Sequence, residues 1–457
     1  MKRIGWKSLA ASSLLLGALT AGAETRPQYG GILHVTMRAA PMSLDPADSR
    51  QADSIPRRSV DALIFDTLVG VDESDRVRPG LAESWQLGRG NQKRQFRVRH
   101  GVKFHDGTAL TADAVASSLR AANPSWVVVV AEDSVIIECD SPDPQLLAEL
   151  ALSRNAIVKR DAENKLIGTG PFRILDWQPG RKLSLAAFED HWSGRPFLDG
   201  IEIEMGRSFR DQMTALELGK AELVEVAPEQ THRVSQAGHA VSSSAPTELL
   251  ALEFTHEASS SEEKSLREAL GFSVDRGSIR NVLLQGAGQP TASLLPTWIS
   301  GYGFVFKADA DLPRARQVRN QVRTAPTWTI AYDANDPLMR LIAERVALNA
   351  KDGGLSLQPS VAASADLRLV RIPLAASDPW VTLQELVAQT GLQAAKSKGG
   401  STEDLYATEQ ADLASERLIP LFHLPVSYSS VSGLRNWTLR MDGSWDLSAA
   451  WLEGAKP

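Results

Sequence analysis

Residues Phe96–Val115 read FRVRHGVKFHDGTALTADAV, and this stretch decides the local fold that the sequence predicts. Apolar and basic residues alternate through its first positions, which is typical of a half-buried strand. Asp106 and Gly107 then form a strong turn signal, because glycine adopts a positive φ without steric cost. Thr111 can cap a following helix, and Asp113 in the first turn would complement the helix dipole. The stretch therefore predicts a strand, a turn and a helix.

A second informative stretch is Ile167–Phe172, IGTGPF. Its glycines invite comparison with a phosphate-binding loop, but no Lys-Ser or Lys-Thr pair follows and Pro171 blocks a helix start at the required place. We therefore expect Gly168 and Gly170 to allow a close crossing of two backbone segments. The first stretch has no catalytic interpretation either. His105 and Asp106 have no nucleophile near them in the sequence and are interpreted as turn residues.

The two stretches in this order resemble the signature of the peptide/nickel class, family 5, of extracellular solute-binding proteins. These proteins are the receptors of ABC importers. The matching residues are Gly101–Gly107 (GVKFHDG), Thr111, Ala112 and Val115, followed by Gly168–Phe172 (GTGPF). Weaker similarities run along the chain, including SLDP at Ser43–Pro46 and REAL at Arg267–Leu270. The resemblance implies an α/β, two-lobed periplasmic-binding-protein-like fold of class II type, with mixed sheets and a hinge of crossing strands.

The resemblance also implies a domain organisation. We expect a signal peptide at residues 1–23 and a main lobe I made from the segments 28–45, 166–247 and 427–457. A satellite subdomain is expected at 46–165, and a lobe II at 248–426. In the family several further helices usually follow the first satellite helix. Here the strand-like Ser125–Asp140 follows almost at once, which predicts a shortened satellite.

The first 23 residues have the pattern of a secretory signal peptide. Lys2, Arg3 and Lys7 precede an apolar run that is too short to span a bilayer, and Ala21–Ala23 is a suitable cleavage site. No cysteine follows the apolar run, so we expect no lipid anchor and a periplasmic location. The only cysteine, Cys139, cannot form an internal disulfide. It is interpreted as a small buried hydrophobe, with a reactive thiol as the alternative.

Composition limits the class of partner. The formal net charge is −6, and cleavage of the basic leader would make the chain more acidic, which argues against nucleic acid and anionic membranes as partners. The resemblance implies instead a small-molecule or peptide ligand, no cofactor, and a monomeric receptor that works with an ABC permease and ATPase.

Periodicity predicts several further elements. The expected helices are Ser208–Gly219, Ser261–Ala269, Asp311–Arg323 and Asp336–Ala350, and the expected strands are Val127–Val130, Val135–Ile137, Phe172–Trp177, Lys182–Phe188, Thr327–Tyr332, Leu355–Val361 and Leu418–Val426. A strand-like run, LLALEF, ends at Phe254 and is expected to cross to lobe II. The Ser/Ala-rich segments Val241–Ala245 and Ala394–Ser401 are predicted to be loops.

By analogy with the family, the ligand cleft lies between the lobes, beside the loop after the first strand and the last crossing strand. Aromatic side chains there would supply contact area with little loss of entropy. The candidate ligand-binding residues are Met42, Trp298, Tyr302, Ser377, Trp380, Phe422 and His423. The alternative for each aromatic residue is an ordinary place in the hydrophobic core.

The loop at Asp378-Pro379 bears most directly on the ligand. Peptide-binding relatives carry an aspartate three residues before the matching Asp-Pro pair, where it binds the ligand's α-amine. This chain has Ala375 at that offset. Asp378 could take over that role, although a residue before proline is more typically a turn former. A peptide or peptide-like solute is the leading hypothesis, and an uncharged or anionic solute, a sugar and a metal chelate remain open.

Other function classes find less support in the sequence. It contains no HExxH, CxxC, G-x-S-x-G or Walker A pattern, so an enzyme is not expected. His191 stands where the family usually has tyrosine, but a single histidine is weak evidence for a metal site. A third alternative is a degenerate relative that acts as a sensor or binds a partner protein, as the shortened satellite and Ala375 would allow.

Overall fold

The computed structural model describes residues 26–50, 54–72, 76–88, 92–139, 141, 143–303, 305–362, 364–374, 378–392 and 400–454. The predicted signal peptide, Ala375 and the candidate Ser377 lie outside these residues. Among the helices that are described, none is long and apolar enough to cross a membrane.

One large mixed sheet of 11 strands organises the molecule. Its strands follow the order β10 (Phe172–Gln178), β11 (Lys182–Ala187), β12 (Gly200–Glu204), β1 (Ile32–Thr36), β13 (Leu223–Val226), β19 (Leu418–Ser430), β14 (Ala240–Phe254), β18 (Leu367–Pro373), β16 (Thr327–Ala331) and β17 (Ser356–Ser360), and β15 (Gln289–Pro290) pairs with β19. Strand β1 is parallel to β12 and β13, and β16 is parallel to β17 and β18. The other pairs in this sheet are antiparallel.

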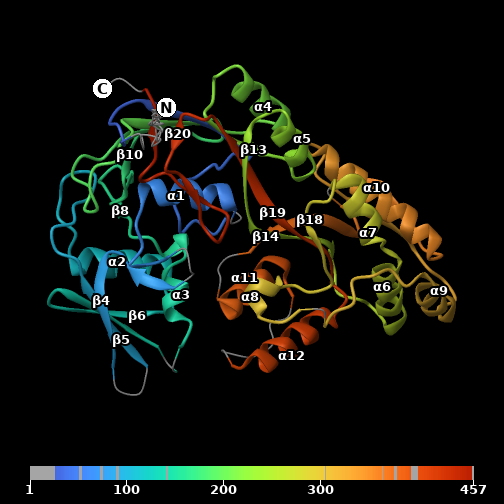
Figure 1. Cartoon of the computed structure of the whole chain (residues 1–457). Helices are drawn as coiled ribbons and strands as arrows, with labels where there is room; N and C mark the ends of the chain where they lie inside the picture. The colour runs from blue at the N-terminus through green and yellow to red at the C-terminus, as the bar shows by residue number, and fades with distance from the viewer. Residues whose placement is uncertain are drawn as a thin grey trace, which may run out of the picture.

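Strands β14 and β19 join the two halves of the sheet (Figure 1). They pair antiparallel from Ala240 opposite Ser430 to Glu253 opposite Leu418. Because both strands are long, each contributes to the lobe on either side. The expected hinge of crossing strands is therefore present.

The prediction of a loop at Val241–Ala245 is wrong, because these residues are the first half of β14. Val241 lies opposite Ser429, and the hydroxyl oxygens of Ser243 and Ser427 are 2.8 Å apart. Pairing with β19 satisfies the backbone of this segment and outweighs the weak strand preference of serine and alanine. The second predicted loop falls mostly on residues 393–399, which lie outside the described residues.

The first lobe surrounds β10 to β13 and carries helices α1 (Ile55–Ile64), α4 (Phe209–Glu217) and α5 (Thr231–Gln236). Leu33 and Val35 of β1 form its core together with Leu63 and Ile64 of α1. Helix α1 belongs to the segment 46–165 that we expected in the satellite, yet it packs into the core of the first lobe. Trp445, from the C-terminal tail, is buried in the same core.

The second lobe covers both faces of its half of the sheet, and the side-chain alternation of β14 shows why. Leu250, Leu252 and Phe254 point to one face, while Leu249 and Ala251 point to the other. The first face packs against α6 (Ser261–Ser273), α9 (Leu312–Gln321) and α10 (Pro337–Asp352), and the second against α8 (Thr297–Ser300), α11 (Pro379–Thr390) and α12 (Thr402–Leu413) (Figure 1). The predicted order of strand, helix and strand is confirmed as β16, α10 and β17.

The satellite has its own sheet, with strand order β4-β5-β7-β6, and its own hydrophobic core. The strands are β4 (Ala82–Leu87), β5 (Lys93–Val98), β6 (Val127–Ala131) and β7 (Ser134–Glu138), and the helices are α2 (Ala112–Ala122) and α3 (Leu146–Leu150). The Thr111 side chain accepts a hydrogen bond from the Ala114 amide and so caps α2 as predicted. Cys139 is half-buried against this core.

Short elements complete the chain. They are the strands β2 (Val69–Val71), β3 (Val77–Pro79), β8 (Lys159–Arg160), β9 (Leu166–Ile167), β20 (Leu434–Arg435), β21 (Thr438–Leu439), β22 (Trp445–Asp446) and β23 (Trp451–Leu452), with the single turns η2 (Ser153–Asn155), η3 (Pro228–Gln230), α7 (Arg276–Ser278) and η4 (Ile279–Leu283).

The two stretches on which the sequence analysis began bind each other. The His105 amide donates to the Gly168 carbonyl (2.9 Å), and His105 Nε2 lies 2.9 Å from the Gly170 carbonyl oxygen, to which it donates. Burial is the largest influence on this imidazole and lowers its pKa. A Cβ atom at Gly168 would lie 1.9 Å from the Ile64 carbonyl oxygen at the end of α1. The signature is thus a tight structural junction between the satellite and the first lobe, as expected.

Candidate functional site: a charged cavity between the lobes

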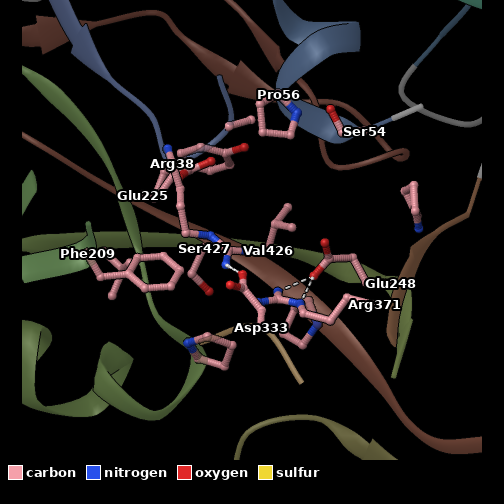
Figure 2. A pocket seen from close by; sticks show the side chains of 16 residues that line it. Arg38, Ser54, Pro56, Phe209, Glu225, Glu248, Asp333, Arg371, Val426 and Ser427 are labelled. Carbon is pink, nitrogen blue, oxygen red and sulfur yellow. Dashed lines mark hydrogen bonds and ion pairs between the residues drawn. The ribbon is translucent and has the colours of Figure 1, made fainter. Parts of the chain in front are cut away.

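A cavity of about 340 Å³ lies where the crossing strands pass between the two lobes. Its walls come from the first lobe, from the second lobe and from β14 and β19 themselves (Figure 2). Ligand sites commonly lie at such domain junctions, and this volume is at the small end of their usual range. The charged residues in the lining are Arg38, Glu225, Glu248, Asp333 and Arg371, and the apolar ones include Phe209, Pro228, Val426 and Tyr428.

Arg38 reaches from the first lobe to the second. It follows β1, and its backbone amide donates to Glu225 Oε2 on the neighbouring β13 (2.6 Å). Its guanidinium Nη1 lies 3.3 Å from Asp336 Oδ2 and 3.7 Å from Asp333 Oδ2 (Figure 2). Asp336 is fixed because its other oxygen caps α10 by accepting from the Leu338 amide. The ion pairs therefore join the end of β1 to the start of α10 across the cavity.

Arg371 and Glu248 form a second ion pair, on the adjacent strands β18 and β14. Arg371 Nε donates to Glu248 Oε2 (3.0 Å), and Nη2 donates to the same oxygen. The two side chains are only 13% and 15% exposed. Arg371 Nη1 is buried, lies 3.9 Å from Asp336 Oδ2 and has no hydrogen-bond partner among the described residues. Although burial opposes it, the negative charge of Glu248 raises the pKa of Arg371.

Two further carboxyl groups beside the cavity, those of Glu225 and Glu229, are poorly solvated because they are buried. Burial raises the pKa of Glu225, against the hydrogen bonds from Gln212 and from the Arg38 amide. Burial also raises the pKa of Glu229, which follows the cavity residue Pro228. Oε2 of Glu229 is buried without a hydrogen-bond partner in the described part of the chain. Ionising either group therefore costs free energy unless a positive charge comes near.

Comparison with known proteins identifies the family of this chain. The profile of the bacterial extracellular solute-binding proteins, family 5, matches residues 76–372. The chain belongs to this family. The nickel-binding protein NikA of Staphylococcus aureus is 28% identical over 251 residues, which are 50% of this chain and 49% of that protein. The chain thus spans about half the length of the curated relatives NikA and the dipeptide-binding protein of Escherichia coli.

Solved structures extend the likeness in fold to nearly the whole chain. The oligopeptide-binding protein AppA of Bacillus subtilis, in complex with a nonapeptide, superposes with a TM-score of 0.81 at 18% identity, covering 93% of this chain and 100% of that one. S. aureus NikA in complex with Ni(L-His)2 gives a TM-score of 0.75 at 18% identity, covering 90% and 97%. The expected two-lobed fold is confirmed.

The predicted ligand contacts that the structure describes are not among the residues that line the cavity, and Ser377 lies outside the described residues. Met42 is 66% exposed on the loop after β1. Trp298, Tyr302 and Trp380 gather in one hydrophobic cluster of the second lobe, under α8, α11 and α12. The Trp298 indole donates to the Pro246 carbonyl (2.8 Å), and the Tyr302 hydroxyl donates to Glu409. These residues are thus partly brought together, and their contact with a ligand stays a prediction.

Phe422 and His423 lie within β19 and are buried. Phe422 is fully enclosed in the core of the second lobe. His423 is 3% exposed, and its Nε2 donates to the Leu294 carbonyl (3.1 Å). Burial lowers the pKa of His423 to about 4, so this side chain is neutral at ordinary pH. Its position in the fold is that of an interior histidine with a satisfied hydrogen bond.

Asp378 and His191 both have structural partners. Asp378 caps α11, because its Oδ1 accepts from the amides of Trp380 and Val381 (3.0 Å each). The predicted role as a local structure former is confirmed. His191 lies beside Asp66, with 3.9 Å between Nε2 and Oδ2. Within the described ranges there is no group of three or more residues that could hold a metal ion.

The charged cavity residues were missed by reasoning from the sequence alone. A signal was present, because Glu225, Glu248 and Arg371 are charged residues next to apolar residues within strands. Such residues are costly to bury without partners and therefore mark either a buried ion pair or a binding site.

Proposed function

We propose that the protein is the periplasmic substrate-binding component of an ABC importer. It captures a small solute between its two lobes and delivers it to the membrane permease and its ATPase, acting as a monomer and without catalysing a reaction. The observation that carries the proposal is the cavity at the lobe junction of a family 5 chain, with walls from both lobes and from the crossing strands.

Capture would work through closure of the lobes about β14 and β19. Beside the Arg38 ion pairs, two other contacts hold the lobes together. Arg58 Nη1 on α1 donates to the Leu374 carbonyl after β18 (2.7 Å), and Arg154 Nη1 of the satellite pairs with Glu385 on α11 (2.7 Å). A solute that bridges the walls of the cavity adds to these contacts and so favours the closed form.

A peptide or peptide-like solute is the class that we propose first. Its support comes from relatives whose names specify peptides, such as the dipeptide-binding protein of E. coli. Trp298 and Tyr302 are proposed as further contacts, since Trp298 is bonded to Pro246 on β14, two residues from the cavity residue Glu248. Ser377 belongs to the same proposal on sequence grounds, whereas Ala375 supplies no carboxylate for a peptide's α-amine.

A thermal-shift screen of the protein without residues 1–23 tests the proposal. Di- to pentapeptides, sugars and metal chelates are each added in excess, and a bound solute at a hundredfold its dissociation constant stabilises the folded state by about 2.7 kcal/mol. A rise in the melting temperature with one solute class is the expected result. If no solute changes the melting temperature, receptor function is excluded, and the degenerate sensor or partner-binding protein takes its place.

A further inference from the structure

The charges around the cavity do not balance. Glu225, Glu248 and Asp333 line it, against Arg38 and Arg371. Asp336, which contacts both guanidinium groups, adds a further carboxylate. Negative charge is therefore in excess at the junction of the lobes.

Part of this excess, at Glu248 and Asp336, is shielded from solvent and therefore weakly screened, whereas Asp333 is open to solvent and salt. The Glu248 and Arg371 side chains are mostly buried, and Glu229 adds a buried carboxyl oxygen without a hydrogen-bond partner among the described residues. Repulsion between like charges also disfavours the ionised carboxylates. Glu248 raises the pKa of Glu225, and Asp336 raises that of Glu229, in addition to the larger effect of burial. A positive charge placed in the cavity would relieve this repulsion.

The cavity already accommodates one cation from the protein itself. The Arg38 Nη1 atom lies 3.7 Å from Asp333 and 3.3 Å from Asp336. The guanidinium carbon is 5.2 Å from the centre of the Phe209 ring, and Figure 2 shows Arg38 with Asp333 and Phe209. Asp333 can still bind a ligand, because its side chain is 51% exposed and its Oδ2 atom lies 3.7 Å from Arg38 Nη1. Carboxylates beside an aromatic ring suit an amine or guanidinium group on a short aliphatic stem.

We propose that the cavity binds the positively charged amine or guanidinium group of a solute's side chain, through Asp333 and Glu248, and that it discriminates against solutes with an anionic side chain. The inference rests on the proposed receptor function and specifies the charge of its ligand.

Isothermal titration calorimetry with Ala-Lys, Ala-Gln and Ala-Glu tests the proposal, together with any solute found in the thermal-shift screen. These dipeptides are similar in size and differ by one unit of charge at each step. We expect Ala-Lys to bind at least about tenfold more tightly than Ala-Glu, which corresponds to one charge-assisted hydrogen bond. Raising the salt concentration should weaken the binding of Ala-Lys more than that of Ala-Gln.

The variant Asp333→Asn locates the effect. Asparagine retains an oxygen that can accept from the Asn335 amide, as Asp333 Oδ1 does, so the fold is expected to be preserved and the ligand-free melting temperature unchanged. The variant should weaken the binding of Ala-Lys about fivefold or more and leave Ala-Gln unaffected. The matched control is Glu344→Gln, which removes an exposed carboxylate of α10 that pairs with Arg340 outside the cavity lining.

Each outcome decides between the two proposals. Preferential binding of Ala-Glu, equal affinity for the three dipeptides, or a neutral or anionic solute as the only ligand overturns the charge selectivity and leaves the receptor function standing. Binding of a cationic solute that Asp333→Asn does not weaken moves the cation away from this cavity and overturns the assignment. No binding by any solute overturns the receptor function itself.

Discussion

The substitution Gly168→Ala is predicted to destabilise the protein strongly, at the junction of the two signature stretches. An added Cβ atom would lie 1.9 Å from the Ile64 carbonyl oxygen and 2.8 Å from Phe65 Cδ1. Cβ atoms essentially never approach another heavy atom within 3.0 Å, so one of the segments must move by about 1.1 Å.

Movement at this point is costly because the carbonyl of Ile64 is held on several sides. Ile64 is the last residue of α1 and is fully buried, and its carbonyl oxygen accepts a hydrogen bond from the Gly170 amide (3.0 Å). On the other side, His105 holds the Gly168 carbonyl. Overpacking of a rigid interior costs about 1–3 kcal/mol, and we expect the upper part of this range or more.

Urea unfolding of the protein without residues 1–23 measures the effect, with Gly271→Ala as the control. Gly271 lies in α6, and a Cβ there meets only Ile419 Cγ2 at the ordinary distance of 3.7 Å. Alanine is the better helix former, so the control should be neutral or stabilising by up to about 1 kcal/mol. A Gly168→Ala variant within about 0.5 kcal/mol of the wild type would refute the steric argument.

Three further predictions concern buried charge and lobe closure. The folded-state pKa of His423 is about 4, below the ordinary histidine pKa of 6.5, so stability should be lost as the pH falls from 6.5 towards 4. His423→Gln should reduce that loss by up to about 3 kcal/mol, measured by urea unfolding at each pH. Burial raises the pKa of Glu416 to about 7, so its ionisation should cost stability as the pH rises above 4.5, and Glu416→Gln should raise the melting temperature at pH 8 but not at pH 4. An equal effect at both pH values would contradict this assignment. Glu385→Gln should weaken the contact between α11 and Arg154 by about 0.5–1 kcal/mol. The radius of gyration of the ligand-free protein, measured by X-ray scattering, should then increase. Arg76→Ala breaks an ion pair inside the satellite and should leave the radius of gyration unchanged.

Local signals predicted much of the fold. The turn at Asp106-Gly107 and the cap at Thr111 are confirmed, because both depend on residues within a few positions of each other. The order of β16, α10 and β17 followed from periodicity. The prediction of a loop at Val241–Ala245 was wrong because this segment forms a strand only through pairing with β19, which lies far along the chain.

The candidate site could not be predicted in the same way. Large aromatic residues were natural candidates for ligand contacts, but burial of Trp380 and Phe422 depends on which face of a strand or helix meets the core. The charged residues of the cavity come from β13, β14 and β18 and from the segments that follow β1 and β16, and only strand pairing brings them together.

By itself the sequence determined the family and the type of fold. The two signature stretches are specific because each glycine meets a local requirement: Gly107 adopts φ +83°, and Gly168 leaves room for the Ile64 carbonyl. Only the tertiary structure decided where charge gathers. Arg38 faces Asp333 and Asp336 because the end of β1 and the start of α10, nearly three hundred residues apart, meet at the same junction of the lobes. Electrostatic energy depends on distance in space and on burial, and neither can be calculated from positions along the chain.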